Sequence, residues 1–157
     1  MKKILLIISL FPIAILVIFF AWSLLTRTQS AAGMVNGQLT PCPDKPNCVC
    51  SEYPDDSAHA IGPIPLPEGG GAESLVVMKT VIESLGGEIQ STDENYLAAT
   101  FTSKFFRFTD DVEVRLDTEA SLIHVRSASR AGYGDMGANL ARVDEIRALF
   151  EEKVQNK

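Results

Sequence analysis

The chain of 157 residues lacks an excess of positive charge. It holds 14 lysines and arginines against 20 aspartates and glutamates, which gives a formal net charge of -6. Because nucleic-acid-binding domains usually carry a basic excess, the sequence predicts no nucleic-acid partner. Basic residues do gather between Arg107 and Arg142, so a local site for an anion is compatible with the acidic total.

Several signatures of known chemistry are also missing. There is no Cys-x-x-Cys pair to support thioredoxin-like redox chemistry, and no Gly-x-Ser-x-Gly elbow of an α/β-hydrolase. The chain contains no internal repeat and no low-complexity stretch. We therefore predict no cofactor, and the sequence favours a protein that is not an enzyme while leaving catalysis open.

What the chain does contain begins with an apolar run, Ile4–Leu25, of 22 residues without a charge. About 20 such residues cross the hydrocarbon core as a helix. Lys2 and Lys3 precede the run, so the positive-inside preference puts the N-terminus in the cytoplasm and the rest outside it, in the periplasm if the cell is Gram-negative. A cleaved secretory signal is the alternative, and it exports the same domain. The predicted organisation is a cytoplasmic tip (1–3), a transmembrane anchor (4–25), a tether (26–40) and an exported domain (41–157).

The chain has few cysteines, and all three, Cys42, Cys48 and Cys50, fall within nine residues. In an exported domain a disulfide is the default. A Cys48–Cys50 bridge is a poor candidate because only Val49 separates the two, so Cys42 would bond to either Cys48 or Cys50. The alternative is a metal-binding module in which the three thiolates act with His59, although zinc sites usually have closer cysteine pairs.

The pattern of apolar residues predicts one domain with two helices and four strands. Residues 51–71 are rich in proline and glycine and read as irregular chain. Consecutive strands with short turns make an antiparallel sheet, so we expect an α+β two-layer sandwich of about four strands with two helices on one face, plus the N-terminal transmembrane helix. The expected helices are Ala72–Leu85 and Ala138–Val154, and the expected strands are Glu88–Ser91, Tyr96–Ser103, Asp111–Asp117 and Leu122–Ala128.

The stretch Ile123–Val143, IHVRSASRAGYGDMGANLARV, leads from a predicted strand through a glycine-containing loop into a predicted helix. Such polar loops are where folds tend to keep function, and the helix start offers its positive dipole end. We expect an anion-binding polar cluster, for which an envelope lipid, a glycan or a partner protein is the candidate ligand. The alternative is that its arginines pair with Asp110, Asp111 and Asp135 and only brace the fold. The predicted ligand-binding residues are Arg126, Arg130, Tyr133, Asp135, Asn139 and Arg142.

A hydrolase or transferase is a second alternative, because His124 with Ser127 or Ser129, and with Asp110, Asp111 or Asp135, supplies the residue types of a catalytic triad. His124 and Ser127 are an odd number of residues apart in one strand, so their side chains point to opposite faces. The last hairpin also sets Arg115 opposite His124 and Glu113 opposite Arg126, as expected for a solvated sheet face. Spacing therefore argues against a triad.

Three motifs follow one another along the chain: CPDKPNCVCS, FRFTDDVEVRLD and IHVRSASRAGYGDMGANLARV. Over roughly two thirds of the chain, from Pro41 to the last helix, they resemble an uncharacterised family of bacteria and plastids, the domain of unknown function numbered 1499. The resemblance implies no activity. Many relatives carry serine where this chain has Cys50, so the resemblance implies that Cys42 pairs with Cys48.

Overall fold

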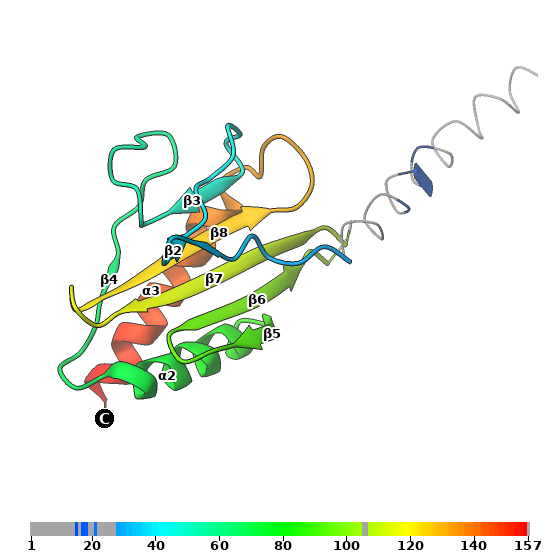
Figure 1. Cartoon of the computed structure of the whole chain (residues 1–157). Coiled ribbons are helices and arrows are strands. Elements are labelled where there is room, and N and C mark those ends of the chain that lie inside the picture. The colour runs from blue at the N-terminus through cyan, green and yellow to red at the C-terminus, as the bar shows by residue number, and fades with distance from the viewer. Residues whose placement is uncertain (1–14, 16, 19–20, 22–27, 105–106, 157) are drawn as a thin grey trace, which may run out of the picture.

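The computed structural model of the protein describes residues 15, 17–18, 21, 28–104 and 107–156. Its main sheet has six strands that pair antiparallel (Figure 1). Along the sheet β5 pairs with β6, β6 with β7 and β7 with β8, while β3 and β4 both pair with the remaining edge of β8. The strands are β3 (Cys48–Cys50), β4 (Ile64–Pro65), β5 (Glu88–Thr92), β6 (Tyr96–Thr102), β7 (Thr109–Asp117) and β8 (Leu122–Ser129).

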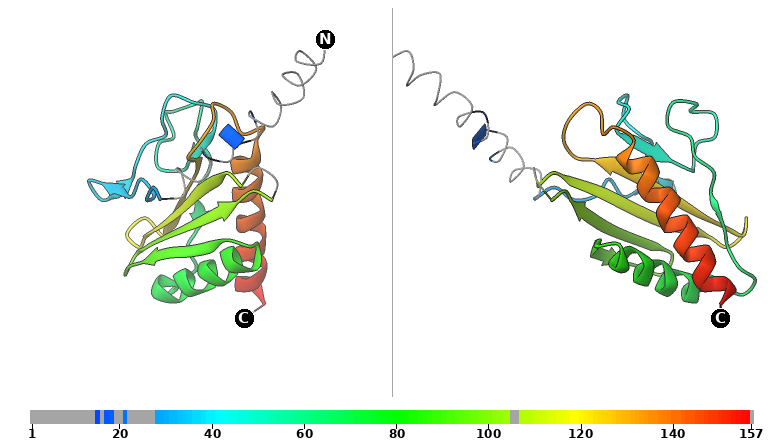
Figure 2. Two further views of the ribbon diagram at one scale, coloured as in Figure 1. Left: turned by 90° about the vertical axis from the view of Figure 1, so that its right-hand side faces the viewer. Right: turned by 180° about the vertical axis from the view of Figure 1, so that it is seen from behind.

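Two helices, α2 (Gly71–Ser84) and α3 (Ala138–Gln155), cover one face of the sheet, here termed the inner face (Figure 2). Side chains alternate along each strand, so β7 turns Val112, Val114 and Leu116 toward the helices, and all three are buried. Burial of this apolar layer is the main drive to fold. The helices contribute fully buried apolar side chains to it, among them Met78, Val81, Ile82, Val143, Ile146 and Phe150.

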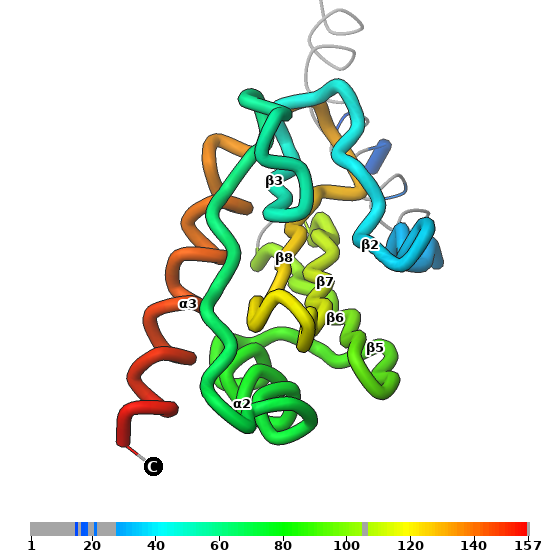
Figure 3. The backbone as a smooth tube through the Cα atoms, turned by 60° about the vertical axis from the view of Figure 1, so that its left-hand side comes forward, coloured from blue at the N-terminus to red at the C-terminus, as the bar shows by residue number. Residues whose placement is uncertain are grey.

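The opposite face of the sheet, termed the outer face, is polar, and over β7 and β8 it is buried. A small hairpin of β1 (Met34–Val35) and β2 (Gln38–Leu39) lies on this side, away from α3 (Figure 3). The segment before and within this hairpin, residues 28–40, is here termed the N-terminal segment. The backbone N–H of Gly33 donates to Glu113 of β7 at 2.6 Å, and this bond holds the N-terminal segment against the sheet. Glu113 is 0 % exposed and its neighbour Arg126 is 5 % exposed. The solvated face predicted from the sequence is therefore a buried polar layer.

The register of the last hairpin agrees with its prediction. Arg115 lies opposite His124, and Glu113 lies opposite Arg126. The two helices and the four strands β5 to β8 begin and end within two residues of the predicted boundaries. These elements are long enough to show a period of 3.6 or of two residues, which is why the pattern located them.

The predicted fold class is nevertheless wrong in two respects. The sheet has six strands rather than about four, because β3 and β4 add to the edge of β8. They are three and two residues long and lie in proline-containing segments, too short to show any alternation. Within the residues that the structure describes, no helix is long and apolar enough to cross a membrane, so the predicted transmembrane helix is not found. Most of Ile4–Leu25 and the predicted tip (1–3) lie outside the described residues.

Cys42 and Cys48 form a disulfide with a Cα–Cα distance of 5.7 Å, which is the pairing that the family resemblance implied. The bridge ties the loop before β3 to the sheet edge. Cys50 is a buried free thiol, and burial raises its pKa, so it stays protonated and unreactive at neutral pH. The disulfide consumes two of the three thiolates that the metal-binding alternative requires. Among the described residues no group of three histidine, cysteine or acidic side chains is placed to hold a metal ion.

Candidate functional site

At the centre of the outer face, the carboxylate of Glu113 accepts three hydrogen bonds. Arg126 Nη1 and the Tyr96 hydroxyl each donate at 2.7 Å, in addition to the backbone of Gly33. Burial and the bond to Glu113 hold the pKa of Tyr96 far above its usual range, so the phenol remains a donor. Through these three bonds Glu113 joins its own strand β7 to β6, β8 and the N-terminal segment.

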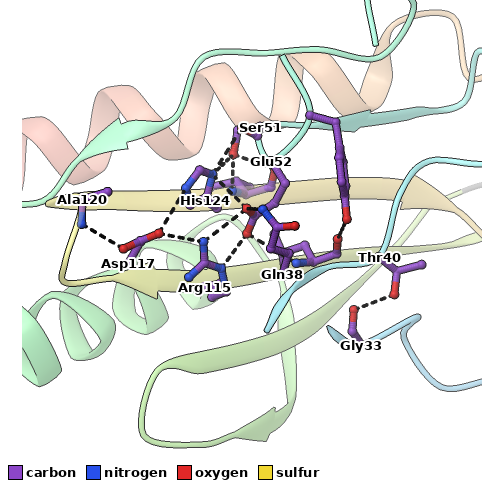
Figure 4. A network of polar contacts seen from close by, with 12 residues as sticks. Gly33, Gln38, Thr40, Ser51, Glu52, Arg115, Asp117, Ala120 and His124 are labelled. Atoms are coloured by element: carbon purple, nitrogen blue, oxygen red, sulfur yellow. Dashed lines mark hydrogen bonds and ion pairs between the residues drawn. The ribbon is translucent and has the colours of Figure 1, made fainter. Parts of the chain in front are cut away.

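A second network lies on the same face, at the end of β3 (Figure 4). Glu52 accepts from Arg115 Nε at 2.6 Å and from the Leu39 backbone N–H at 3.3 Å. Arg115 Nη2 also donates to Asp117 at 3.0 Å. The His124 ring completes the network, with Nδ1 3.7 Å from Glu52 and Nε2 4.0 Å from Asp117. The network thus fastens the β1–β2 hairpin and the loop after β3 to the sheet.

The serine beside His124 is Ser51, which the sequence did not single out. His124 Nδ1 lies 3.3 Å from Ser51 Oγ and 3.2 Å from the Ser51 carbonyl oxygen. Ser51 Oγ also accepts the Val125 backbone N–H at 2.8 Å, and the residue is 5 % exposed. Ser127 points to the inner face, as strand alternation predicted, and bonds to Asn139. The structure therefore does not bring His124 together with Ser127 or Ser129, the serines predicted for the hydrolase alternative, both of which bond to Asn139.

Arg130, just beyond β8, forms the third acid–base pair of the outer face. Its Nε donates to Asp111 Oδ2 at 2.9 Å and its Nη2 to Oδ1 at 2.7 Å. This two-point contact is the strongest geometry that arginine and a carboxylate adopt. The Arg130 side chain is 5 % exposed, so the pair is held rigidly in the sheet surface.

Asn139 and Arg142, both from α3, lie on the inner face instead. Asn139 Oδ1 accepts from the Ser127 hydroxyl at 2.6 Å and from Arg142 Nη1 at 2.7 Å. Asn139 Nδ2 donates to the Asn47 carbonyl at 2.9 Å. Arg142 Nη2 pairs with Asp110 at 2.7 Å. This cluster joins the start of α3 to β7, β8 and the disulfide loop.

The two remaining predicted residues, Tyr133 and Asp135, lie in the loop between β8 and α3. Tyr133 is 73 % exposed. Asp135 accepts the backbone N–H groups of Asn139 at 2.8 Å and Gly137 at 3.1 Å, so it caps the first turn of α3.

The six predicted ligand-binding residues consequently do not form one cluster. Arg126 and Arg130 lie on the outer face, Asn139 and Arg142 on the inner face, and Tyr133 in the loop between them. Each of the three arginines has a carboxylate of the same domain as its partner. These pairings favour the alternative that the side chains brace the fold, and their role in ligand binding stays a prediction.

Asp135 should make the stability of the protein depend on pH. Burial raises its pKa, but the N–H groups of Asn139 and Gly137 outweigh it and leave the pKa below the usual value. The carboxylate therefore stabilises the fold above its unfolded pKa of about 3.9, and this contribution is lost as pH falls through the lower folded pKa.

We expect Asp135→Ala to lower the free energy of unfolding at pH 7 by about 1 kcal/mol, the usual cost of a lost cap. Urea titrations should show this difference shrinking below about pH 4. Asp144→Ala, at an exposed position on the same helix, is the matched control. A difference that persists unchanged in acid would contradict the assigned cap.

Beside Arg130 the outer face is hollowed by two adjoining cavities of about 360 Å³ and about 180 Å³. They share Gln90 and Arg130, and we term the two together the polar groove. The floor is formed by outer-face side chains of β5, β6 and β7, and the N-terminal segment forms one wall of the larger cavity. The other lining residues are Thr28, Gln29, Ser30, Ala31, Ser91, Tyr96 and Ala98 in the larger cavity, and Glu88, Thr100, Thr102, Arg107 and Thr109 in the smaller.

Thr109 is the unusual member of the polar groove. It is 3 % exposed, and its hydroxyl has no hydrogen-bond partner in the structure. Among the described residues the other buried side-chain polar atom in this condition is Arg126 Nε. Buried polar groups are nearly always paired, so this unpaired hydroxyl, in a residue that lines the smaller cavity, calls for an explanation.

Sequence reasoning missed Glu52, Ser51, Gln90 and Thr109. Ser51 and Glu52 lie in the stretch 51–71 that the sequence predicts as irregular chain, where no period marks a face. Thr109 does continue the alternation of Asp111 and Glu113, so extending that strand by one pair of residues would have placed it on the polar face.

A comparison with curated proteins finds no match. The family described as "Protein of unknown function (DUF1499)" matches residues 38–150, which span β3 to most of α3 and include every strand of the main sheet. This chain belongs to that family of unknown function.

Proposed function

We propose that this domain is a binding module that holds a small polar molecule in the polar groove. The observation that carries the proposal is the buried, unpartnered hydroxyl of Thr109, a residue that lines the smaller cavity of that groove. Leaving such a group unsatisfied costs about 1–3 kcal/mol, which a bound molecule with a complementary polar atom would recover.

The dimensions and the construction of the groove support this function. Ligand pockets measure roughly 300–1,000 Å³, and the larger cavity, at about 360 Å³, lies at the lower end of that range. Its floor belongs to the central sheet, where β6 pairs with β7 over the whole length of β6. A floor of this kind is formed before the ligand arrives, which lowers the entropic cost of binding.

Binding without catalysis is the reading that the lining favours. The described lining contains no histidine and no cysteine, and the buried acid next to it, Asp111, is engaged by Arg130. The groove therefore offers donors and acceptors, and the one carboxylate in its described lining, Glu88, is exposed and has no described histidine in the lining beside it.

We further propose that the domain works outside the cytoplasm, in an oxidising compartment. The Cys42–Cys48 disulfide supports this location, since such bridges form and persist mainly in exported proteins. The cell envelope, with its glycans and lipids, would then be the source of the ligand.

Native mass spectrometry of the full chain, purified from the cells that make it, tests the binding function. We expect the protein to carry an adduct of small mass, and we expect Thr109→Val to lose it. The variant should fold normally, because it removes a hydroxyl that has no protein partner. Thr80→Val, on an exposed turn of α2, should retain the adduct. An adduct that survives in Thr109→Val, or none in the wild type, would refute the proposed site.

A further inference from the structure

Among the described residues, the charges in and beside the lining of the polar groove balance one another. Arg130 is neutralised by its two-point contact with Asp111, which lies in the adjacent strand. Arg107 and Glu88 contribute one charge of each sign to the wall of the smaller cavity. A groove without a net charge gives an anionic ligand no Coulombic advantage to repay the loss of its hydration.

The uncharged part of the lining consists mainly of groups that both donate and accept hydrogen bonds. Thr100, Thr102 and Thr109 form a threonine patch in the lining of the smaller cavity, with the Thr109 hydroxyl itself buried. Gln90 belongs to the lining of both cavities. Gln90 Nε2 already donates to Thr100 Oγ1 at 3.0 Å, so the patch is ordered. Hydroxyls and amides of this kind complement a ligand whose own groups also donate and accept, which is the character of a hydroxyl group.

The larger cavity adds apolar surface to these polar groups. Ala31 and Ala98 contribute methyl groups, and Tyr96 contributes the body of an aromatic ring whose hydroxyl is engaged by Glu113. A ring with many hydroxyls and an apolar C–H face matches both surfaces at once. We infer that the molecule held in the polar groove is an uncharged saccharide, an inference that rests on the proposed binding function.

The inference is tested by titrating the ¹⁵N-labelled full chain with maltose, N-acetylglucosamine, glucuronate, citrate and inorganic phosphate. We expect the neutral sugars to shift the backbone amide resonances of Gln90, Thr100, Thr109 and Arg130, with a Kd of about 1 mM or tighter for so small a ligand. The affinity for maltose or N-acetylglucosamine should be unchanged between about 50 mM and about 500 mM salt, because no charge is screened.

Thr109→Val should raise the Kd for the neutral sugar roughly three- to tenfold, the value of one hydrogen bond, and Thr80→Val should leave it unchanged. If citrate or phosphate shifts these amides in a salt-dependent way while the neutral sugars do not, the saccharide assignment falls and the binding function stands. The same holds if a native adduct is present but no sugar shifts these resonances. If there is neither an adduct nor a shift with any probe, both proposals fall.

Discussion

Replacing Glu113 by glutamine should lower the free energy of unfolding by about 3–5 kcal/mol, the usual cost of removing one partner from a buried ion pair. Glu113 is 0 % exposed, and its carboxylate accepts from Arg126, Tyr96 and the backbone of Gly33. Glutamine preserves the volume but removes the charge that balances Arg126. The guanidinium would remain buried, with its Nε already unpartnered.

Urea unfolding followed by circular dichroism measures this loss at pH 7. Glu119→Gln, at an exposed position of the turn between β7 and β8, is the matched control and should change stability by less than about 0.5 kcal/mol. The double variant Glu113→Leu with Arg126→Met removes both charges and should be more stable than Glu113→Gln. A loss below about 1 kcal/mol for Glu113→Gln would show that this ion pair is screened by water.

The behaviour of the outer face also explains how the N-terminal segment is placed. The carboxylates of Glu113 and Glu52 accept backbone N–H groups of Gly33 and Leu39 while they pair with arginines of the sheet. The same two acids therefore organise the sheet surface and the segment that covers it. Since that segment also forms one wall of the polar groove, the shape of the groove depends on these buried ion pairs.

How much of this could be predicted depended on the length of each element. Alternation over β7 and β8 is long enough to fix the register, so it set Glu113 opposite Arg126 correctly. The same pattern predicted a solvated face, because nothing in the residues of β7 reveals that another segment covers them. The covering segment has no regular period, and Glu52 lies in a loop, so their contacts depend on the three-dimensional path of the chain.

The candidate site was harder to predict, for a related reason. Arg126 and Arg130 are separated by an even number of residues and point to the outer face, whereas Asn139 belongs to a helix that covers the inner face. Alternation alone therefore divides the motif between two sides of the sheet. The polar groove, in contrast, arises from β5, β6, β7 and the N-terminal segment together, and no local pattern encodes such a meeting of distant segments.

Asn139 is the residue whose loss should most disturb the inner face. It is 0 % exposed and uses its amide to join four partners from β8, the disulfide loop and α3 itself. These partners are Ser127, Ser129, Asn47 and Arg142. Alanine would leave the Ser127 hydroxyl without its acceptor, and the Asn47 carbonyl would keep only the Ser129 backbone N–H. We expect Asn139→Ala to cost about 2–4 kcal/mol, from one or two buried polar groups left unsatisfied together with the cavity formed.

Asn156→Ala is the matched control, since Asn156 lies at the exposed end of the same helix and donates to the Glu152 carbonyl only one turn away. Its loss should cost no more than a few tenths of a kcal/mol, as is usual for an exposed surface position. Native-state hydrogen exchange adds a local readout, because the Ser129 backbone N–H donates to the Asn47 carbonyl at 3.0 Å, next to the bond from Asn139. Faster exchange at Ser129 in Asn139→Ala, with the β6–β7 ladder still protected, is the expected result. Equal losses of stability in Asn139→Ala and Asn156→Ala would show that the amide of Asn139 does not hold α3 to the sheet.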